Sequence, residues 1–198
     1  GSYQDNLPHP DPWQGLVFRY RIGCTHANLY RKAALLEVGG WNEDLPDNED
    51  PELHFRLLRA GLLYHIVPTV LCVYHHHDEG QLSGRDPIGG NRRRLELLEQ
   101  ITAYLKDRRP AYWATHQAFF IGALLRALRV YASHDLGAAA GAYARLFKQG
   151  FAERPALIAP LILKAYGLLG FRRTEQLRLA LGRFVPRSWK DHLKNPRT

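Results

Sequence analysis

The sequence predicts an α+β protein, in which residues 1–90 mix helices with short strands and residues 91–198 form an all-α helical region. Two observations support this division. Apolar residues recur at helical spacing from residue 91 onward, whereas β-branched and aromatic residues gather in residues 62–74. The charge changes at the same point: residues 1–90 hold 7 Lys/Arg and 12 Asp/Glu, a net −5, and residues 91–198 hold 20 and 7, a net +13.

The front part begins with a loop over residues 3–15, where prolines lie too close together for regular structure. Residues 16–21 alternate loosely in character and predict a short strand. Residues 30–38 predict a helix that ends at Gly39 and Gly40, because glycine readily adopts the left-handed conformation that terminates a helix.

Residues 51–60 carry the clearest helix signal in the chain. Asp50 occupies the expected N-cap position, Pro51 fits the first helical residue, and Gly61 fits just past the end. Residues 62–74 then predict two short strands divided by Pro68, which cannot donate a hydrogen bond to a sheet.

A polar loop over residues 75–90 leads into the helical part. Asp135 is expected to cap one of its helices. The apolar periodicity places these helices at residues 92–107, 112–133, 136–149, 155–169 and 173–184.

Composition excludes several classes of protein. With 45% hydrophobic and 23% charged residues the chain is globular rather than disordered. Two cysteines allow neither a disulfide framework nor a cysteine-based zinc site, which favours a reducing, cytoplasmic compartment. The longest apolar stretch, residues 156–171, is too short for a membrane span and contains Lys164. A Gly1-Ser2 start and the absence of methionine suggest that sequence precedes the chain.

Asn48-Glu49-Asp50 is the first candidate site. Acidic residues at a helix start are stabilised by the helix dipole, which is sufficient reason for them to be there. A carboxylate held rigidly at that position is also well placed to accept a proton from a hydroxyl group.

His75-His76-His77 is the second candidate site. At the end of a strand, His75 and His77 would point to one side and His76 to the other. Imidazole binds zinc or manganese, but three adjacent histidines lack the spacing of a helical zinc site, so these residues alone do not form a complete one. The alternative is a solvated histidine loop.

Four segments occur in an ordered arrangement: GCTHANLYRK at residues 23–32, LEVGGWNEDL at 36–45, NEDPELHFRL at 48–57, and YHHH at 74–77. Together they resemble the second half of family 2 glycosyltransferases of the GT-A fold. The resemblance covers about a third of the chain and implies that residues 1–90 are the acceptor-side part of a catalytic domain, a partial GT-A-type α/β segment, with residues 91–198 as a helical accessory region.

The resemblance implies a role for each matching residue. Asp50 would be the catalytic base and Glu49 would orient the acceptor. His77 would help to hold a divalent metal, Mn or Mg, and the donor diphosphate, and Ser83 would lie on a loop over the donor. His75 stands where the family often has a diphosphate-binding arginine, which is a departure from the family pattern. It is a second metal candidate because it would point to the same side as His77.

Four further candidates are weaker. Arg85 could replace the missing arginine, and Trp41 could stack on a sugar ring or simply be buried. His26 and Asn28 could hydrogen-bond an acceptor or serve only as turn residues.

The expected function is therefore inverting transfer of a sugar from a nucleotide-sugar donor to the hydroxyl of a saccharide or lipid-linked acceptor, a hexosyltransferase-type activity. The family's nucleotide-binding first half has no counterpart before residue 22, so we expect little turnover from this chain alone. The alternatives are a non-catalytic helical interaction module and a metal-dependent hydrolase built on His75, His77 and Asp50.

The basic helical region is either a solvated face or a peripheral contact with the inner membrane. The region does not interleave basic and stacking aromatic residues, so no nucleic-acid partner is expected.

Overall fold

The computed structural model describes residues 7–18, 20–23, 25–67, 69, 72–73 and 85–182. All regular secondary structure in these residues is helical, so the predicted α+β class, with its partial GT-A-type α/β segment, is wrong, and the described chain is all-α. The elements are α1 (Pro12–Val17), the 3-10 helix η1 (Thr25–Ala27), α2 (Lys32–Glu37), α3 (Glu49–Arg59), α4 (Pro87–Arg108), α5 (Pro110–Ala132), α6 (Leu136–Leu146) and α7 (Pro160–Gly182).

Helix α1 replaces both the end of the loop predicted over residues 3–15 and the start of the strand predicted at residues 16–21, so the two predictions are wrong there. Asp11 accepts a hydrogen bond from the backbone N–H of Gln14 at 3.1 Å, and Pro12 takes the first helical position, so local capping starts a helix there. Residues 62–67, the described start of the predicted strand pair, have no regular structure. A strand needs a neighbouring strand to satisfy its backbone, and the described residues supply none.

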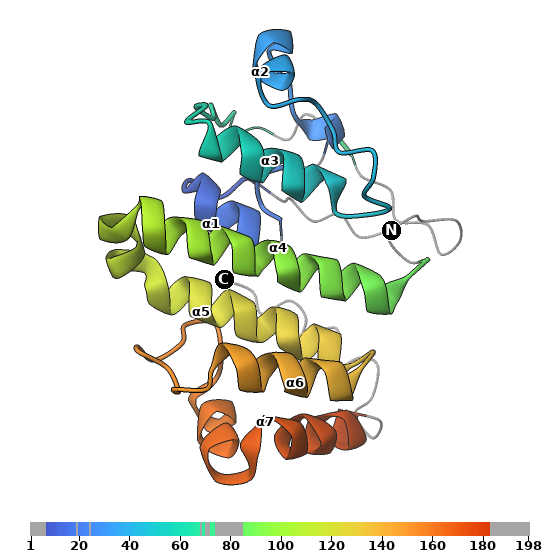
Figure 1. Ribbon diagram of the computed structural model, residues 1–198, viewed down its shortest axis with the longest axis vertical. Coiled ribbons are helices and arrows are strands. Elements are labelled where there is room, and N and C mark those ends of the chain that lie inside the picture. Colours follow the sequence, from blue (N-terminus) through green and yellow to red (C-terminus); the bar gives the residue numbers. More distant parts are fainter. Residues whose placement is uncertain are drawn as a thin grey trace.

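Helices α4, α5, α6 and α7 follow one another down the long axis of the molecule (Figure 1). Arg109 alone separates α4 from α5, and these two helices pack along each other. Next, α6 packs on α5 and α7 packs on α6, while the short α1 contacts both α3 and α5. The element α2 lies at the opposite end of the long axis from α7 (Figure 1).

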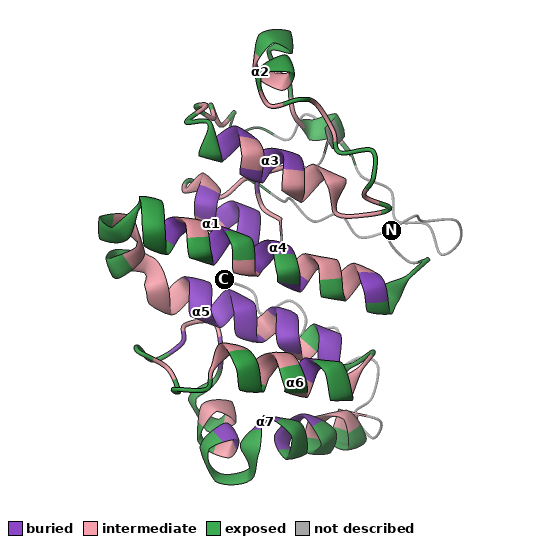
Figure 2. Cartoon of the chain, in the orientation of Figure 1, coloured by how far each residue is buried: buried purple, intermediate pink, exposed green. Residues whose placement is uncertain are grey.

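One buried cluster runs through this stack, centred on α4 and α5 (Figure 2). Its innermost side chains include Leu105, Phe120, Leu125 and Leu128, all with no exposed surface. Each such side chain stabilises the fold by about 1.5–3 kcal/mol relative to leaving it in water. The α4–α5 pair therefore forms the centre of the hydrophobic core, and the smaller front elements pack against it.

The predicted helices of the second half are confirmed, with shifted ends. Helix α4 starts earlier than expected, because Asp86 caps it by accepting from the N–H of Gly89 at 2.9 Å. Asp135 caps α6 as predicted, accepting from the N–H of Ala138 at 2.8 Å. The two helices predicted for residues 155–169 and 173–184 form the single element α7, broken at Gly170, whose φ of 78° and ψ of 162° are not helical. No helix in the described part of the chain has the length and apolar character to cross a membrane.

Candidate functional site

The helix that carries Glu49 and Asp50 begins earlier than predicted. Its N-cap is Asn48, with a left-handed φ of 59°, and Asp50 is the second helical residue, so the expected N-cap role of Asp50 is wrong. Asparagine tolerates this backbone conformation better than most residues. Glu49, Asp50 and Glu52 all lie in the first turn, where the helix dipole favours negative charge.

The opposite end of α3 behaves as predicted. Gly61 has a φ of 77°, its N–H donates to the carbonyl of Leu58 at 3.2 Å, and the N–H of Leu62 donates to the carbonyl of Leu57 at 3.1 Å. This pair of bonds is the glycine-dependent helix stop that the sequence indicated.

The loop before α3 is fastened to the start of α4 by Arg93. Its guanidinium donates to both carboxylate oxygens of Asp47, at 2.7 and 2.6 Å, and to Asp86 at 3.0 Å. The paired arginine holds the pKa of the Asp47 carboxyl below its usual range. Asn48 adds a bond to the carbonyl of Gly90 at 3.2 Å. The position of Asp50 is thus set by a helix distant in sequence.

Trp41 holds Asp50 directly. Its indole N–H donates to Oδ1 of Asp50 at 3.1 Å. The turn that presents Trp41 needs two glycines, since Gly39 and Gly40 have φ values of 81° and 70°. Their N–H groups bond back to Leu36 and Leu35 at the end of α2. The Gly-Gly stop predicted from the sequence is confirmed, and it delivers Trp41 to the start of α3.

Behind Trp41, half-buried tyrosine side chains surround the buried imidazole of His54. The ring of Tyr30 meets Trp41 edge to face, with centroids 5.7 Å apart, and the Tyr30 hydroxyl is 2.8 Å from Nε2 of His54. On the other side, the Tyr20 hydroxyl is 2.5 Å from Nδ1 of the same imidazole. A neutral imidazole has one donor and one acceptor nitrogen, so one tyrosine donates to His54 and the other accepts from it.

Burial keeps His54 neutral. The side chain has no exposed surface, and loss of hydration lowers its pKa to about 4, although the nearby charge of Asp50 acts in the opposite direction. The ring of Tyr64 packs edge-on against it, with centroids 5.8 Å apart. Burial also raises the pKa of the Tyr64 hydroxyl. The side chains that pack behind Trp41 are therefore the uncharged imidazole of His54 and the tyrosine rings around it.

Trp41 also lines an open hollow of about 350 Å³, together with Gly39, Asn42, Glu43, Glu52 and Arg56. Arg56 donates to both oxygens of Glu52, at 2.7 and 2.8 Å, and to the backbone carbonyl of Val38. An aromatic side chain beside amide, carboxylate and guanidinium groups is an arrangement that suits a polyhydroxylated ligand.

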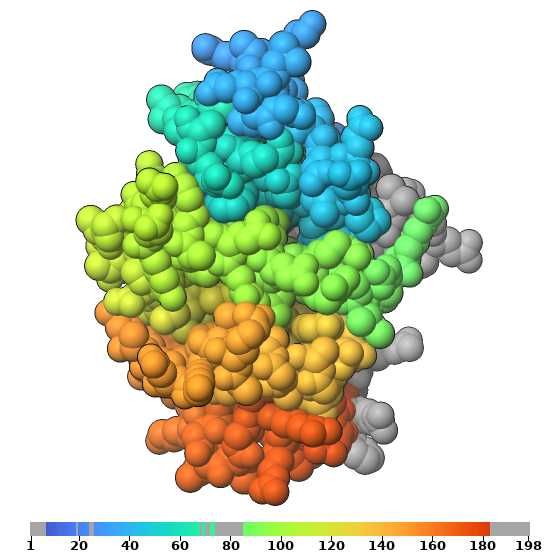
Figure 3. Space-filling view, in the orientation of Figure 1, coloured from blue at the N-terminus to red at the C-terminus, as the bar shows by residue number. Residues whose placement is uncertain are grey.

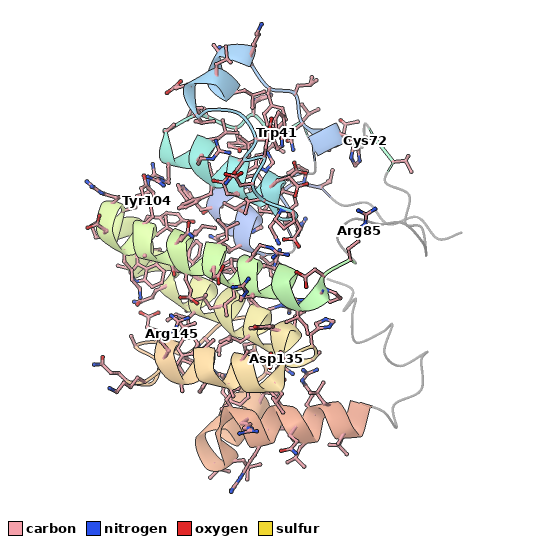
Figure 4. All side chains as sticks on the ribbon, turned by 45° about the vertical axis from the view of Figure 1, so that its right-hand side comes forward. Trp41, Cys72, Arg85, Tyr104, Asp135 and Arg145 are labelled. Carbon is pink, nitrogen blue, oxygen red and sulfur yellow. The ribbon has the colours of Figure 1, made fainter. Side chains whose placement is uncertain are left out.

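Three other predicted site residues do not line the hollow beside Trp41. His26 is exposed in the middle of η1, and Asn28 packs over Gly23, where an added Cβ would lie 2.8 Å from its amide nitrogen. Arg85 is exposed just before Asp86, at the start of α4, and Figure 4 shows it away from Trp41, which lies beside α3.

The predicted metal ligands His75 and His77, and the predicted loop residue Ser83, lie outside the described residues. In the part that the structure describes, no three His, Cys, Asp or Glu side chains are grouped as a metal site would require.

Sequence reasoning missed the aromatic support: Tyr20, Tyr30, His54 and Tyr64. One signal was available, because Asp50 and His54 are four residues apart and so share a face of α3. The tyrosines come from separate segments and gave no such signal.

Comparison of the chain with protein-family models, curated proteins and solved structures found no match.

Proposed function

We propose that this chain supplies the acceptor-binding side of an inverting glycosyltransferase of the family 2 type, with Asp50 as the general base. The observation that supports it is the double role of Trp41, which donates to Asp50 and lines the adjacent hollow. A base and a surface on which a sugar ring can stack are thereby joined by one side chain.

In the proposed reaction an acceptor hydroxyl oxygen attacks the anomeric carbon of a nucleotide-sugar. The new glycosidic bond forms as the bond from that carbon to the nucleoside diphosphate breaks, and the hydroxyl proton passes to Asp50. Because Trp41 binds Oδ1, we assign the proton to Oδ2. Glu49, the preceding residue on α3, orients the acceptor.

In this proposal the acceptor saccharide binds in the hollow lined by Trp41. Trp41 stacks on one sugar ring, while Asn42, Glu43 and the Arg56–Glu52 pair bond its hydroxyl groups. Such a surface takes a saccharide rather than an apolar molecule, because fixed polar groups left without a partner would cost free energy on binding.

The donor needs residues beyond this site. A divalent Mn or Mg ion would neutralise the leaving diphosphate, with His75 and His77 as its predicted ligands. The described residues account for the base and the acceptor only.

The test is a sugar-transfer assay of the protein that contains this chain. The protein is mixed with saccharide acceptors and each of a panel of nucleotide-sugars, and the nucleoside diphosphate released is measured. Asp50→Asn should lower kcat by about 10²- to 10⁴-fold, the usual contribution of a general base, with acceptor binding retained. Asp44→Asn, at an exposed carboxylate of the preceding loop, is the matched control and should leave the rate unchanged.

If Asp50→Asn still transfers sugar at the parent rate, Asp50 is not the general base. Hydrolysis by the purified protein without any nucleotide, together with a bound metal lost in His77→Ala, would instead support the metal-dependent hydrolase. Saccharide or protein binding with no transfer from any nucleotide-sugar would support a non-catalytic module.

A further inference from the structure

Helix α7 exposes an unusual number of large apolar side chains. Leu168 is 85% exposed, Leu161 77%, Leu181 64% and Leu177 52%. Single exposed leucines are ordinary on protein surfaces, but several on one helix mark a surface that contacts something apolar. Most of the helix surface that packs inward is accounted for by Tyr166, Phe171, Thr174 and Glu175.

The exposed leucines are arranged in two stripes, one on each side of the break at Gly170. Leu161, Lys164 and Leu168 follow i, i+3, i+7 spacing and share one side of the first segment. Arg173, Leu177 and Leu181 follow i, i+4, i+8 spacing and share one side of the second. Each stripe contains two leucines and one cation.

The exposed surface of α7 carries only positive charge. Its single acidic residue, Glu175, has no exposed surface and accepts hydrogen bonds from the Tyr166 hydroxyl at 2.7 Å and from Arg178 at 2.5 Å, with Arg129 at 3.2 Å. The exposed charged residues of this helix are Lys164, Arg172 and Arg173. The fold has buried and neutralised the one carboxylate that would repel an anionic surface.

The helix also has a suitable position. It lies at the end of the molecule, with α6 on one side, and at the opposite end of the long axis from α2 (Figure 3). A flat, extended partner could approach α7 there without meeting the segment that holds Trp41 and Asp50.

We propose that α7 docks on an anionic lipid surface. Its exposed leucines enter the boundary between headgroups and acyl chains, and Lys164, Arg172 and Arg173 contact lipid phosphates. The inference does not depend on glycosyl transfer.

Charge decides between this partner and the alternatives. A second copy meeting the same face would bring cations against cations, which disfavours self-association. Nucleic acid would satisfy the cations but would leave the leucines in water.

The experiment is sedimentation of the protein with vesicles of phosphatidylcholine alone and of phosphatidylcholine mixed with phosphatidylglycerol. The parent should bind the anionic vesicles, less so at high salt, and bind the neutral ones weakly. The double variant Leu168→Ser/Leu177→Ser should lower the partition coefficient by at least about tenfold. Arg173→Gln should lower it by about fivefold. The matched control is Leu63→Ser, since Leu63 is 99% exposed but lies outside α7, and it should bind as the parent does.

Four results would overturn the proposal. Binding to neither kind of vesicle removes the lipid partner, and equal binding to neutral and anionic vesicles removes the role of anionic lipid. An equal loss of binding in Leu63→Ser shows that the effect is not specific to α7. If sedimentation without lipid shows a dimer that the double leucine variant abolishes, the face is a protein interface instead.

Discussion

His54 should make the stability of this protein fall as the solution becomes acidic. Its imidazole is buried between Tyr20 and Tyr30, and burial lowers its pKa from the ordinary 6.5 to about 4. In the unfolded chain the same side chain is hydrated and binds a proton at much higher pH. Between these two pKa values the unfolded state therefore binds more protons than the folded state.

The sign and size follow from this difference. A depressed folded-state pKa gives a contribution that is fully present above about pH 6.5 and is lost as the pH falls toward 4. The slope approaches about 1.4 kcal/mol per pH unit inside this window. The free energy of unfolding should consequently fall by about 2 kcal/mol between pH 7 and pH 5, and by about 3 kcal/mol at pH 4, through this residue alone.

The assay is urea-induced unfolding, followed by far-ultraviolet circular dichroism across this pH range, for the parent and for His54→Gln. Glutamine keeps a hydrogen-bonding side chain but does not titrate, so the stability difference between parent and variant should shrink by about 3 kcal/mol from pH 7 to pH 4. His65→Gln, at an exposed histidine, should follow the parent. Parallel curves for the parent and His54→Gln would refute the argument, because they would mean that His54 titrates alike in both states.

Four further substitutions test the packing, each by urea unfolding at neutral pH. Gly122→Ala should destabilise the protein by about 1–3 kcal/mol, because an added Cβ would lie 1.9 Å from the backbone oxygen of Ala156. Gly141→Ala should instead stabilise α6 by about 0.5–1 kcal/mol, because nothing lies within 4 Å of the added Cβ and alanine favours a helix. Equal effects at the two glycines would contradict the close packing at α5. Glu175→Ala should cost about 3–5 kcal/mol, since it leaves arginine charges without their buried partner; a loss below 1 kcal/mol would show that the carboxylate is hydrated. Arg93→Ala should lower the free energy of unfolding by about 2 kcal/mol, because it removes the bonds to the largely buried carboxylate of Asp47. An unchanged urea midpoint would show that this ion pair is not formed in solution.

Much of the candidate site could be anticipated where one short segment determines it. The Gly39-Gly40 stop and the acidic start of α3 are local features, and both were predicted. The exact cap was not, because Asn48 takes that position only when its left-handed backbone is held by Asp47 and Gly90. A contact with α4 thus displaced the predicted helix start by two residues.

The network around Asp50 could not be predicted in the same way. Trp41 was recognised as a candidate, but its bond to Asp50 depends on how the turn after α2 folds back on α3. The tyrosine partners of His54 approach from different segments, and no spacing in the sequence relates them. Burial of a histidine is also a tertiary property, so its lowered pKa had no counterpart in the sequence.

By itself the sequence determined the helices of the second half, the Asp135 cap and the Gly61 stop, because helix bonds join residues four apart and caps act within a single turn. Only the tertiary structure decided that residues 62–67 form no strand and that Glu175 is buried. The break at Gly170 falls between the two helices that the sequence predicted. A strand needs a distant partner, and burial needs a surface to pack against. Neither is encoded in a local pattern, so the helices of the second half could be predicted from the sequence, whereas the failure of the predicted strands and the aromatic contacts of His54 could not.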